Sequence, residues 1–213
     1  MSKDLTPQKA LIFRITHRDN IPWILDHGLH CRSAQCTDPN YVDIGNPDLI
    51  SKRSLHPVPL PPRGTLSDYV PFYFTPFSPM LYNVITGWGG IRKRNKDEIV
   101  IMVSSLHEIK KRGIQFLFTD RHAYLAAAQF HSDLARLDQI DWPMLQRRDF
   151  KNDPDDPGKK ERYQAEALIY KHAPIDALAG FACYSDAVVG TISQNLATRK
   201  LTSKVVKKTD WYF

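Results

Sequence analysis

The stretch Tyr163-Gln164-Ala165-Glu166-Ala167-Leu168-Ile169-Tyr170 places one carboxylate inside an apolar run that favours a strand. Its residues alternate with the two-residue period of a β-strand. A buried carboxylate on such a strand is costly unless a cation or hydrogen-bond donor meets it. Two interpretations stay open at this point. Glu166 belongs to a functional site, or it lies on a solvated strand face or in a structural ion pair with an arginine.

The composition is that of an ordinary soluble globular protein. The chain has 213 residues, of which 42% are hydrophobic and 24% are charged. This length suits one sizeable core, so we expect residues 1–213 to form a single domain. The formal charge of +6 and the pI near 9.2 favour an anionic partner, with nucleic acid as the first candidate.

The cysteines and histidines argue against a disulfide framework and a metal site. Cys31, Cys36 and Cys183 are odd in number and contain no CxxC pair, which favours a reducing cytoplasm. The eight histidines lack a spacing typical of metal ligands. Residues 1–9 are polar, so no secretory signal is expected, and no apolar run approaches the roughly 18 residues of a membrane helix. We expect a soluble, cytoplasmic protein.

Short strands and helices are expected along the chain without regular βαβ alternation. Strands are predicted at 11–17, 69–74, 98–103, 116–119, 163–170 and 205–213, with strand or turn at 177–183. Helices are predicted from an Asp19 or Asn20 cap to Gly28, at 123–137 and at 187–197, with a helix or turn at 80–85. Long loops are expected at 30–65 and 141–158, and a basic glycine-rich loop at 87–97. This order predicts an α+β fold, and no Gly-rich dinucleotide or phosphate-binding fingerprint follows a strand.

Three segments together resemble the DarT family of ADP-ribosyltransferase toxins. They are Arg14-Ile15-Thr16-His17, Asp68-Tyr69-Val70-Pro71-Phe72-Tyr73-Phe74-Thr75-Pro76-Phe77-Ser78-Pro79-Met80-Leu81-Tyr82 and Gln164-Ala165-Glu166. The resemblance extends to Phe118-Thr119-Asp120-Arg121-His122 and to the terminal Trp211-Tyr212-Phe213. It implies an ADP-ribosyltransferase fold, with two mainly antiparallel sheets, flanking helices and an NAD cleft between the sheets.

The resemblance also implies a function. DarT proteins transfer ADP-ribose from NAD+ to a base in single-stranded DNA, with thymidine favoured here, and are typically paired with the macrodomain antitoxin DarG. Guanine is the alternative base, and a transferase acting on protein is a further alternative. An inactive module that binds NAD or nucleic acid is a hypothesis from a different class. The presence of both Glu166 and Arg53 argues against the inactive module.

Two residues are the expected catalytic pair. Cleavage of the nicotinamide–ribose bond passes through a cationic transition state, which a carboxylate beside the ribose can stabilise. The resemblance assigns this role to Glu166. It assigns Arg53 to the pyrophosphate or to the target base, where an arginine stabilises an anionic base because it stays protonated.

The resemblance also implies further contacts, and several of these residues have a purely structural alternative. The residues expected to bind NAD are Arg14, Ile15, Thr16, Trp23, Cys31, Arg53, Tyr73, Ser78 and Tyr82, although relatives often have histidine where Arg14 stands. The residues expected to bind DNA are His122, Met80 and Arg92, and the segment 122–166 is expected to select the acceptor base. Without the resemblance, the hydroxyl groups would be ordinary turn or strand residues, and the basic residues a solvated face.

Overall fold

The fold is built from short strands. The structure is a computed structural model, and it describes residues 2–213. The strands are β1 Leu11–His17, β2 Leu29–His30, β3 Tyr69–Tyr73, β4 Ile99–Ser105, β5 Phe116–Thr119, β6 Phe130–His131, β7 Glu166–Tyr170, β8 His172–Ala173, β9 Gly180–Cys183 and β10 Lys204–Lys207. Eight of them form one sheet in the order β10-β9-β4-β1-β3-β7-β5-β6, and β2 pairs with β8 in a second, small sheet.

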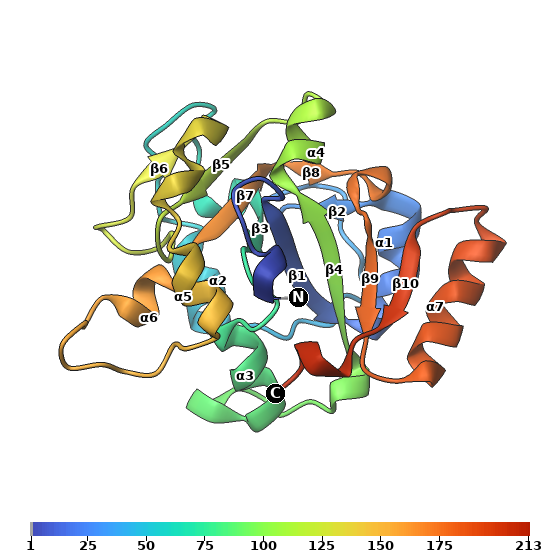
Figure 1. Cartoon of the computed structure of the whole chain (residues 1–213). Coiled ribbons are helices and arrows are strands. Elements are labelled where there is room, and N and C mark those ends of the chain that lie inside the picture. The colour runs from blue at the N-terminus through green and yellow to red at the C-terminus, as the bar shows by residue number, and fades with distance from the viewer. Residues whose placement is uncertain (1) are drawn as a thin grey trace.

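The predicted α+β class is confirmed. All strand pairs in the described chain are antiparallel except β10 with β9, so the two sheets are mainly antiparallel but very unequal in size. The helices are α1 Ile21–His27, α2 Pro47–Arg53, α3 Pro79–Thr86, α4 Leu106–Lys111, α5 Trp142–Arg147, α6 Lys159–Arg162 and α7 Asp186–Thr198. Figure 1 shows α7 beside β9 and β10, with α2, α5 and α6 on the opposite side of the view.

The large sheet consists of two halves that meet at one point. Strands β1 and β3 share a single registered pair, Phe13 with Tyr73, whereas β1 has seven such pairs with β4 and β3 has five with β7. The Arg14 guanidinium donates from Nη1 to Pro71 O at 2.8 Å, so a side chain joins the strands where the backbone ladder stops. A gap between half-sheets therefore opens beside Arg14.

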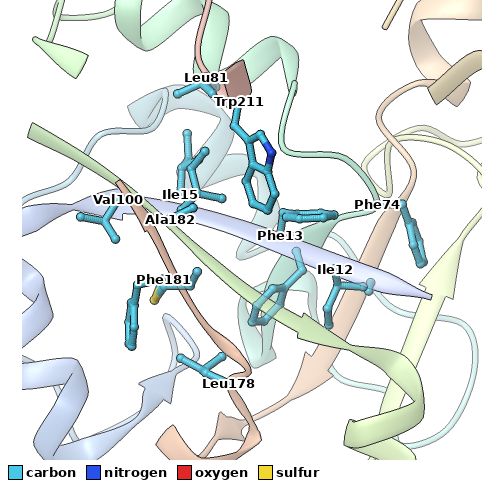
Figure 2. Packing of buried hydrophobic residues seen from close by; sticks show 14 of the residues in the cluster. Ile12, Phe13, Ile15, Phe74, Leu81, Val100, Leu178, Phe181, Ala182 and Trp211 are labelled. Carbon is cyan, nitrogen blue, oxygen red and sulfur yellow. The ribbon is translucent and has the colours of Figure 1, made fainter. Parts of the chain in front are cut away.

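The core spans both half-sheets and the terminal segment. Figure 2 shows Phe13, Ile15 and Trp211 packed among residues from several strands, and the Phe13 and Trp211 ring centroids lie 5.4 Å apart. Tyr212 Oη donates to Ile99 O at 2.9 Å and to Ala182 O at 3.0 Å. The predicted strand at 205–213 is accordingly wrong beyond Lys207, because the last residues cap the core through their aromatic rings.

The helix predicted at 123–137 is wrong. Asp120 closes a loop instead, because its Oδ1 accepts from Gln129 N at 2.9 Å while its own N–H donates to Gln129 O at 3.3 Å. Ala126 and Ala127 are exposed, so this alanine-rich segment has no apolar stripe to bury as a helix. The segment continues into β6 and the 3-10 helix Leu134–Gln139.

The two predicted long loops each contain a helix. Helix α2 lies within 30–65 and α5 lies within 141–158. The predicted helix from Asn20 to Gly28 is confirmed as α1. Gly28 ends it with φ of 76°, and a Cβ there would lie 2.5 Å from His172 Nε2, so only glycine lets β2 approach β8.

Candidate active site

A cavity of about 400 Å³ lies at the gap between the half-sheets. Arg14 and Ile15 of β1 line one side, and Tyr73 of β3 and Glu166 of β7 line the other. Strand β1 has no further ladder with β3 there, so the cavity replaces backbone pairing. Ligand sites in proteins are concave spaces of this kind with a few convergent polar groups.

Glu166 is fixed by the centre of the second half-sheet. It is the first residue of β7, which lies between β3 and β5, and its side chain is 1% exposed. Its backbone N–H donates to Thr119 Oγ1 at 3.2 Å, and Tyr73 is its cross-strand neighbour. Strand β7 is buried on both faces up to Ile169, so the alternation seen in the sequence does not reflect one wet face.

Arg53 meets the carboxylate from a separate element. It is the last residue of α2, a helix that Asn46 caps by accepting from Leu49 N at 3.1 Å. Arg53 Nη1 donates to Glu166 Oε1 at 3.1 Å, and Nη2 lies 2.9 Å from Oε2. Ala123 N donates to Oε1 at 3.0 Å. Both predicted catalytic residues therefore meet in the cavity, which makes the structural ion pair part of the same site.

The surroundings keep Glu166 ionised. Burial raises the pKa of Glu166, but the Arg53 guanidinium together with His122 and the Ala123 N–H outweighs burial and lowers it. His122 Nδ1 lies 3.6 Å from Oε1, and burial lowers the pKa of His122 although Glu166 opposes this shift. Because a histidine of lowered pKa is neutral near pH 7, Arg53 supplies the positive charge that holds the carboxylate.

Two partly buried arginines have buried guanidinium nitrogens that can donate hydrogen bonds to a ligand. Among residues 2–213, Arg14 Nε has no hydrogen-bond partner. Arg53 Nη2 also lacks an aligned acceptor, since its 2.9 Å approach to Oε2 is an ion-pair contact in which no N–H is directed at the oxygen. Both arginines line the cavity. Arginine donors of this kind fit the charged pyrophosphate and the amide oxygen of NAD+.

The cavity collects most of the residues singled out in the sequence. The predicted site residues that line it are Arg14, Ile15, Trp23, Cys31, Arg53, Tyr73, Met80, His122 and Glu166. Burial is the main cause that raises the pKa of Tyr73, and the Glu166 charge adds to it. The Tyr73 phenol therefore stays a neutral hydroxyl beside the carboxylate. No group of three or more His, Cys, Asp or Glu side chains within residues 2–213 could hold a metal ion.

Four predicted site residues lie outside the cavity lining. Thr16 is fully buried, and its Oγ1 accepts from Asn20 Nδ2 at 3.0 Å. Ser78 caps α3 by accepting from Leu81 N at 3.1 Å. The other two are Tyr82, which packs on Phe150 and Phe213, and Arg92, which is exposed on the loop after α3. The structure thus gives Thr16, Ser78 and Tyr82 structural partners, and ligand contact by all four stays a prediction.

Some site residues were missed in the sequence. Gln164 and Asn83 line the cavity, and Thr119 and the Ala123 N–H hold Glu166. Helix α2 had a readable signal, because Asn46 followed by Pro47 is a typical helix start. The Ala123 contact had none, since a backbone N–H carries no side-chain identity.

The chain is similar to proteins that modify DNA. The family model described as "ssDNA thymidine ADP-ribosyltransferase, DarT" matches residues 13–213. A protein of Escherichia coli O127:H6 named "DNA ADP-ribosyl transferase" is 57% identical over 212 residues, which cover 100% of this chain and 97% of that protein. These matches span nearly the full length of both chains.

Solved structures agree with the sequence relatives. "Thermus sp. 2.9 DarT in complex with ADP-ribosylated ssDNA" superposes with a TM-score of 0.89 at 34% identity, covering 97% of this chain and 98% of that chain. The same enzyme "in complex with NAD+" gives 0.84 at 34% identity, covering 97% and 99%. "Thermosipho africanus DarTG in complex with ADP-ribose" shares the fold at a TM-score of 0.72 and 20% identity, over 95% of this chain and 51% of that chain.

No helix among residues 2–213 is both long and apolar enough to cross a membrane. The expected ADP-ribosyltransferase fold and the use of NAD+ as ADP-ribose donor are confirmed. The chain belongs to the DarT family and is an NAD+-dependent ADP-ribosyltransferase that acts on single-stranded DNA.

Proposed function

We propose that Glu166 and Arg53 together carry out transfer of ADP-ribose from NAD+ to thymidine in single-stranded DNA. The observation that carries this assignment is the buried Glu166 carboxylate, held at the cavity wall by Arg53 Nη1 at 3.1 Å and Ala123 N at 3.0 Å. A carboxylate preorganised in this way stabilises positive charge without reorganising during the reaction.

Glu166 acts on the donor. The bond between the ribose C1′ and the nicotinamide nitrogen breaks, and nicotinamide leaves with the bonding electron pair. The ribose carbon becomes cationic, and the Glu166 carboxylate stabilises this charge while it accepts a hydrogen bond from a ribose hydroxyl. The lowered pKa of Glu166 supports this role, because only the ionised form supplies the charge.

Arg53 acts on the acceptor and on the phosphates. A thymine ring nitrogen must lose its proton before it forms the new bond to C1′. Arginine stays protonated, so Arg53 stabilises the deprotonated ring by charge, and the proton leaves to water or to Glu166. Arg53 is attached to α2, whose residues are all at least partly exposed, which permits the guanidinium to turn from Glu166 to a ligand.

The acceptor base is selected by the segment 122–166. His122 lines the cavity 3.6 Å from Glu166, and the neighbouring Ala123 N–H binds the same carboxylate oxygen. A base that enters here presents the edge that Watson–Crick pairing would occupy, so the substrate must be unpaired. Met80, which also lines the cavity, is the proposed apolar contact to the base.

Labelled NAD+ with matched oligonucleotides tests the proposal. A single-stranded oligonucleotide with one thymine should be labelled, whereas the annealed duplex and a version with that thymine replaced should not. Label on a guanine-bearing, thymine-free strand would move the acceptor to guanine, and label on protein alone would refute DNA as the substrate. Glu166→Gln serves as the inactive reference and Glu108→Gln as the matched control, because Glu108 lies on α4, outside the segment 122–166 and the cavity lining, and its side chain is 35% exposed.

Three further assignments belong to the proposal. The partner is a macrodomain antitoxin of the DarG type, supported by the resemblance and by the shared fold of the Thermosipho africanus DarTG structure. The location is the cytoplasm, supported by the free thiols of Cys31, Cys36 and Cys183. Residues 1–213 act as one domain, supported by a core that runs through both half-sheets.

A further inference from the structure

The loop after α3 presents an aromatic ring to solvent. Trp88 is 66% exposed, one of three large hydrophobic side chains in the described chain that are so placed. Single exposed apolar residues are common, but an indole is the largest apolar side chain and is usually mostly buried. Its surroundings therefore decide whether the exposure has a function.

The loop backbone is shaped to hold Trp88 outward. Gly87, Gly89 and Gly90 have φ of 80°, 69° and 75°, a conformation that other residues rarely adopt. The Trp88 N–H donates to Thr86 Oγ1 at 3.3 Å, which fixes the base of the side chain. No heavy atom outside the adjoining residues lies within 4 Å of a Cβ built on Gly89 or Gly90, so the loop beside Trp88 is open to solvent.

Some basic side chains of this loop form an ion pair within the described chain, and others do not. Arg94 pairs with Glu98 at 3.3 Å, and its N–H donates to Val84 O at 2.8 Å. Arg92 and Lys93 are exposed and, among residues 2–213, form no ion pair. The exposed Trp88 ring is thus within five residues, along the chain, of two basic side chains that form no ion pair in the described chain, Arg92 and Lys93.

The loop adjoins the rim of the active-site cavity. Asn83 and Val84 of α3 and Ile91 of the loop line the cavity, so Trp88 lies between two cavity-lining points along the chain. In Figure 1 this segment runs along the lower edge of the molecule from α3 towards β4. A DNA strand whose target base enters the cavity must lay its neighbouring nucleotides over such a rim.

We propose that Trp88 stacks an unpaired base two or more nucleotides away from the modified one, while Arg92 and Lys93 hold the adjoining phosphates. The proposal rests on single-stranded DNA as the substrate. Proteins that bind single strands combine aromatic rings, on which bases stack, with cations that follow the phosphates. Stacking tolerates any base, so Trp88 adds affinity without adding sequence preference.

Strand length separates this role from a role in chemistry. Binding of fluorescein-labelled oligonucleotides, measured by anisotropy without NAD+, compares a thymine with one nucleotide on each side against a thymine with six. Trp88→Ala should weaken binding of the long strand about 5- to 100-fold and leave the short one unchanged, and Trp88→Phe should retain most of the affinity. Val206→Ala is the matched control, because Val206 is 42% exposed on β10, an edge strand of the large sheet.

The salt dependence of DNA affinity distinguishes the contribution of the Trp88 ring from that of Arg92 and Lys93. Arg92→Ala/Lys93→Ala should lower the slope of log affinity against log salt by about 1.4, whereas Trp88→Ala should leave the slope unchanged. Wild-type affinity of Trp88→Ala for the long strand, or an equal loss on both lengths, would overturn the stacking role. Since this binding needs no transfer, a wild-type protein that binds but does not label thymine would count against the proposed acceptor and not against Trp88.

Discussion

Glu166 and Arg53 form one ion pair, yet they come from regions of very different construction. Glu166 begins β7, which is paired with both β3 and β5 and buried. Arg53 ends the seven-residue helix α2, none of whose residues is buried, inside the long segment between β2 and β3. The scaffold therefore fixes the carboxylate and leaves the guanidinium on an element that can move at small cost.

This difference suits the two roles. A group that stabilises a transition state must be held before the reaction, whereas a group that meets two ligands must change partners. Removal of Arg53 by movement of α2 would leave Glu166 with the Ala123 N–H and a neutral His122. The bound substrate then supplies the charge that Arg53 supplied.

The largest expected effect is at the fixed partner. Glu166→Gln or Glu166→Ala should lower the transfer rate about 100- to 1,000-fold, because the contact to the cationic ribose is lost. Initial rates with labelled NAD+ and a thymine-bearing single strand measure it. Glu108→Gln should keep wild-type rates, and a rate near wild type in Glu166→Gln would remove the carboxylate from catalysis.

Arg53 comes next in size. Arg53→Ala should lower the rate about 100-fold and also lower the melting temperature, because Glu166 would then be a buried charge without its main partner. Arg53→Lys should recover stability more than rate, since lysine keeps the charge but loses the planar fork. Lys52→Ala, at an exposed neighbour, is the control. Full activity of Arg53→Lys would show that diffuse charge is sufficient.

The pH dependence of stability sharpens the comparison further. The pKa of Glu166 is lowered from its ordinary 4.5, so the unfolded chain binds a proton at a higher pH than the folded one. The resulting stabilisation is fully present above pH 4.5 and is lost as the pH falls through the lower folded value. Melting temperatures of wild type should exceed those of Glu166→Gln at pH 7 and converge below pH 4.5. A gap that stays constant over this range would contradict the lowered pKa.

The smallest expected effect is confined to helix α2, which carries Arg53. Asn46→Ala removes the cap of α2 and should destabilise that helix by about 1 kcal/mol. Amide hydrogen exchange should become about 5-fold faster in residues 47–53 and stay unchanged in 166–170. Equal acceleration in both segments would mean that α2 and β7 open as one unit.

The sequence was sufficient where local pattern and burial agree. The β-branched run at 98–103 became β4, and the cap and glycine around 20–28 became α1. It failed at 123–137, where a helix was predicted but Asp120 bonds to Gln129 and closes a loop. That contact joins residues nine apart and has no local signature.

The site was predictable in identity more than in placement. The lone carboxylate in 163–170 indicated Glu166, and the family resemblance indicated Arg53. The structure places Arg53 Nη2 2.9 Å from Glu166 Oε2. The same resemblance placed Ser78 in the NAD site, but its Oγ caps α3. A motif specifies which residue type recurs at a position, whereas side-chain direction depends on packing that only the folded chain defines.

A double-mutant cycle tests most directly whether Glu166 and Arg53 act as one unit. Transfer rates are compared for wild type, Glu166→Gln, Arg53→Ala and the double variant, on the same thymine-bearing single strand with saturating NAD+. Residues that act as a unit give non-additive losses, so the double variant should be no slower than the slower single variant. Losses that multiply in the double variant would show that the two residues act independently and would contradict the account.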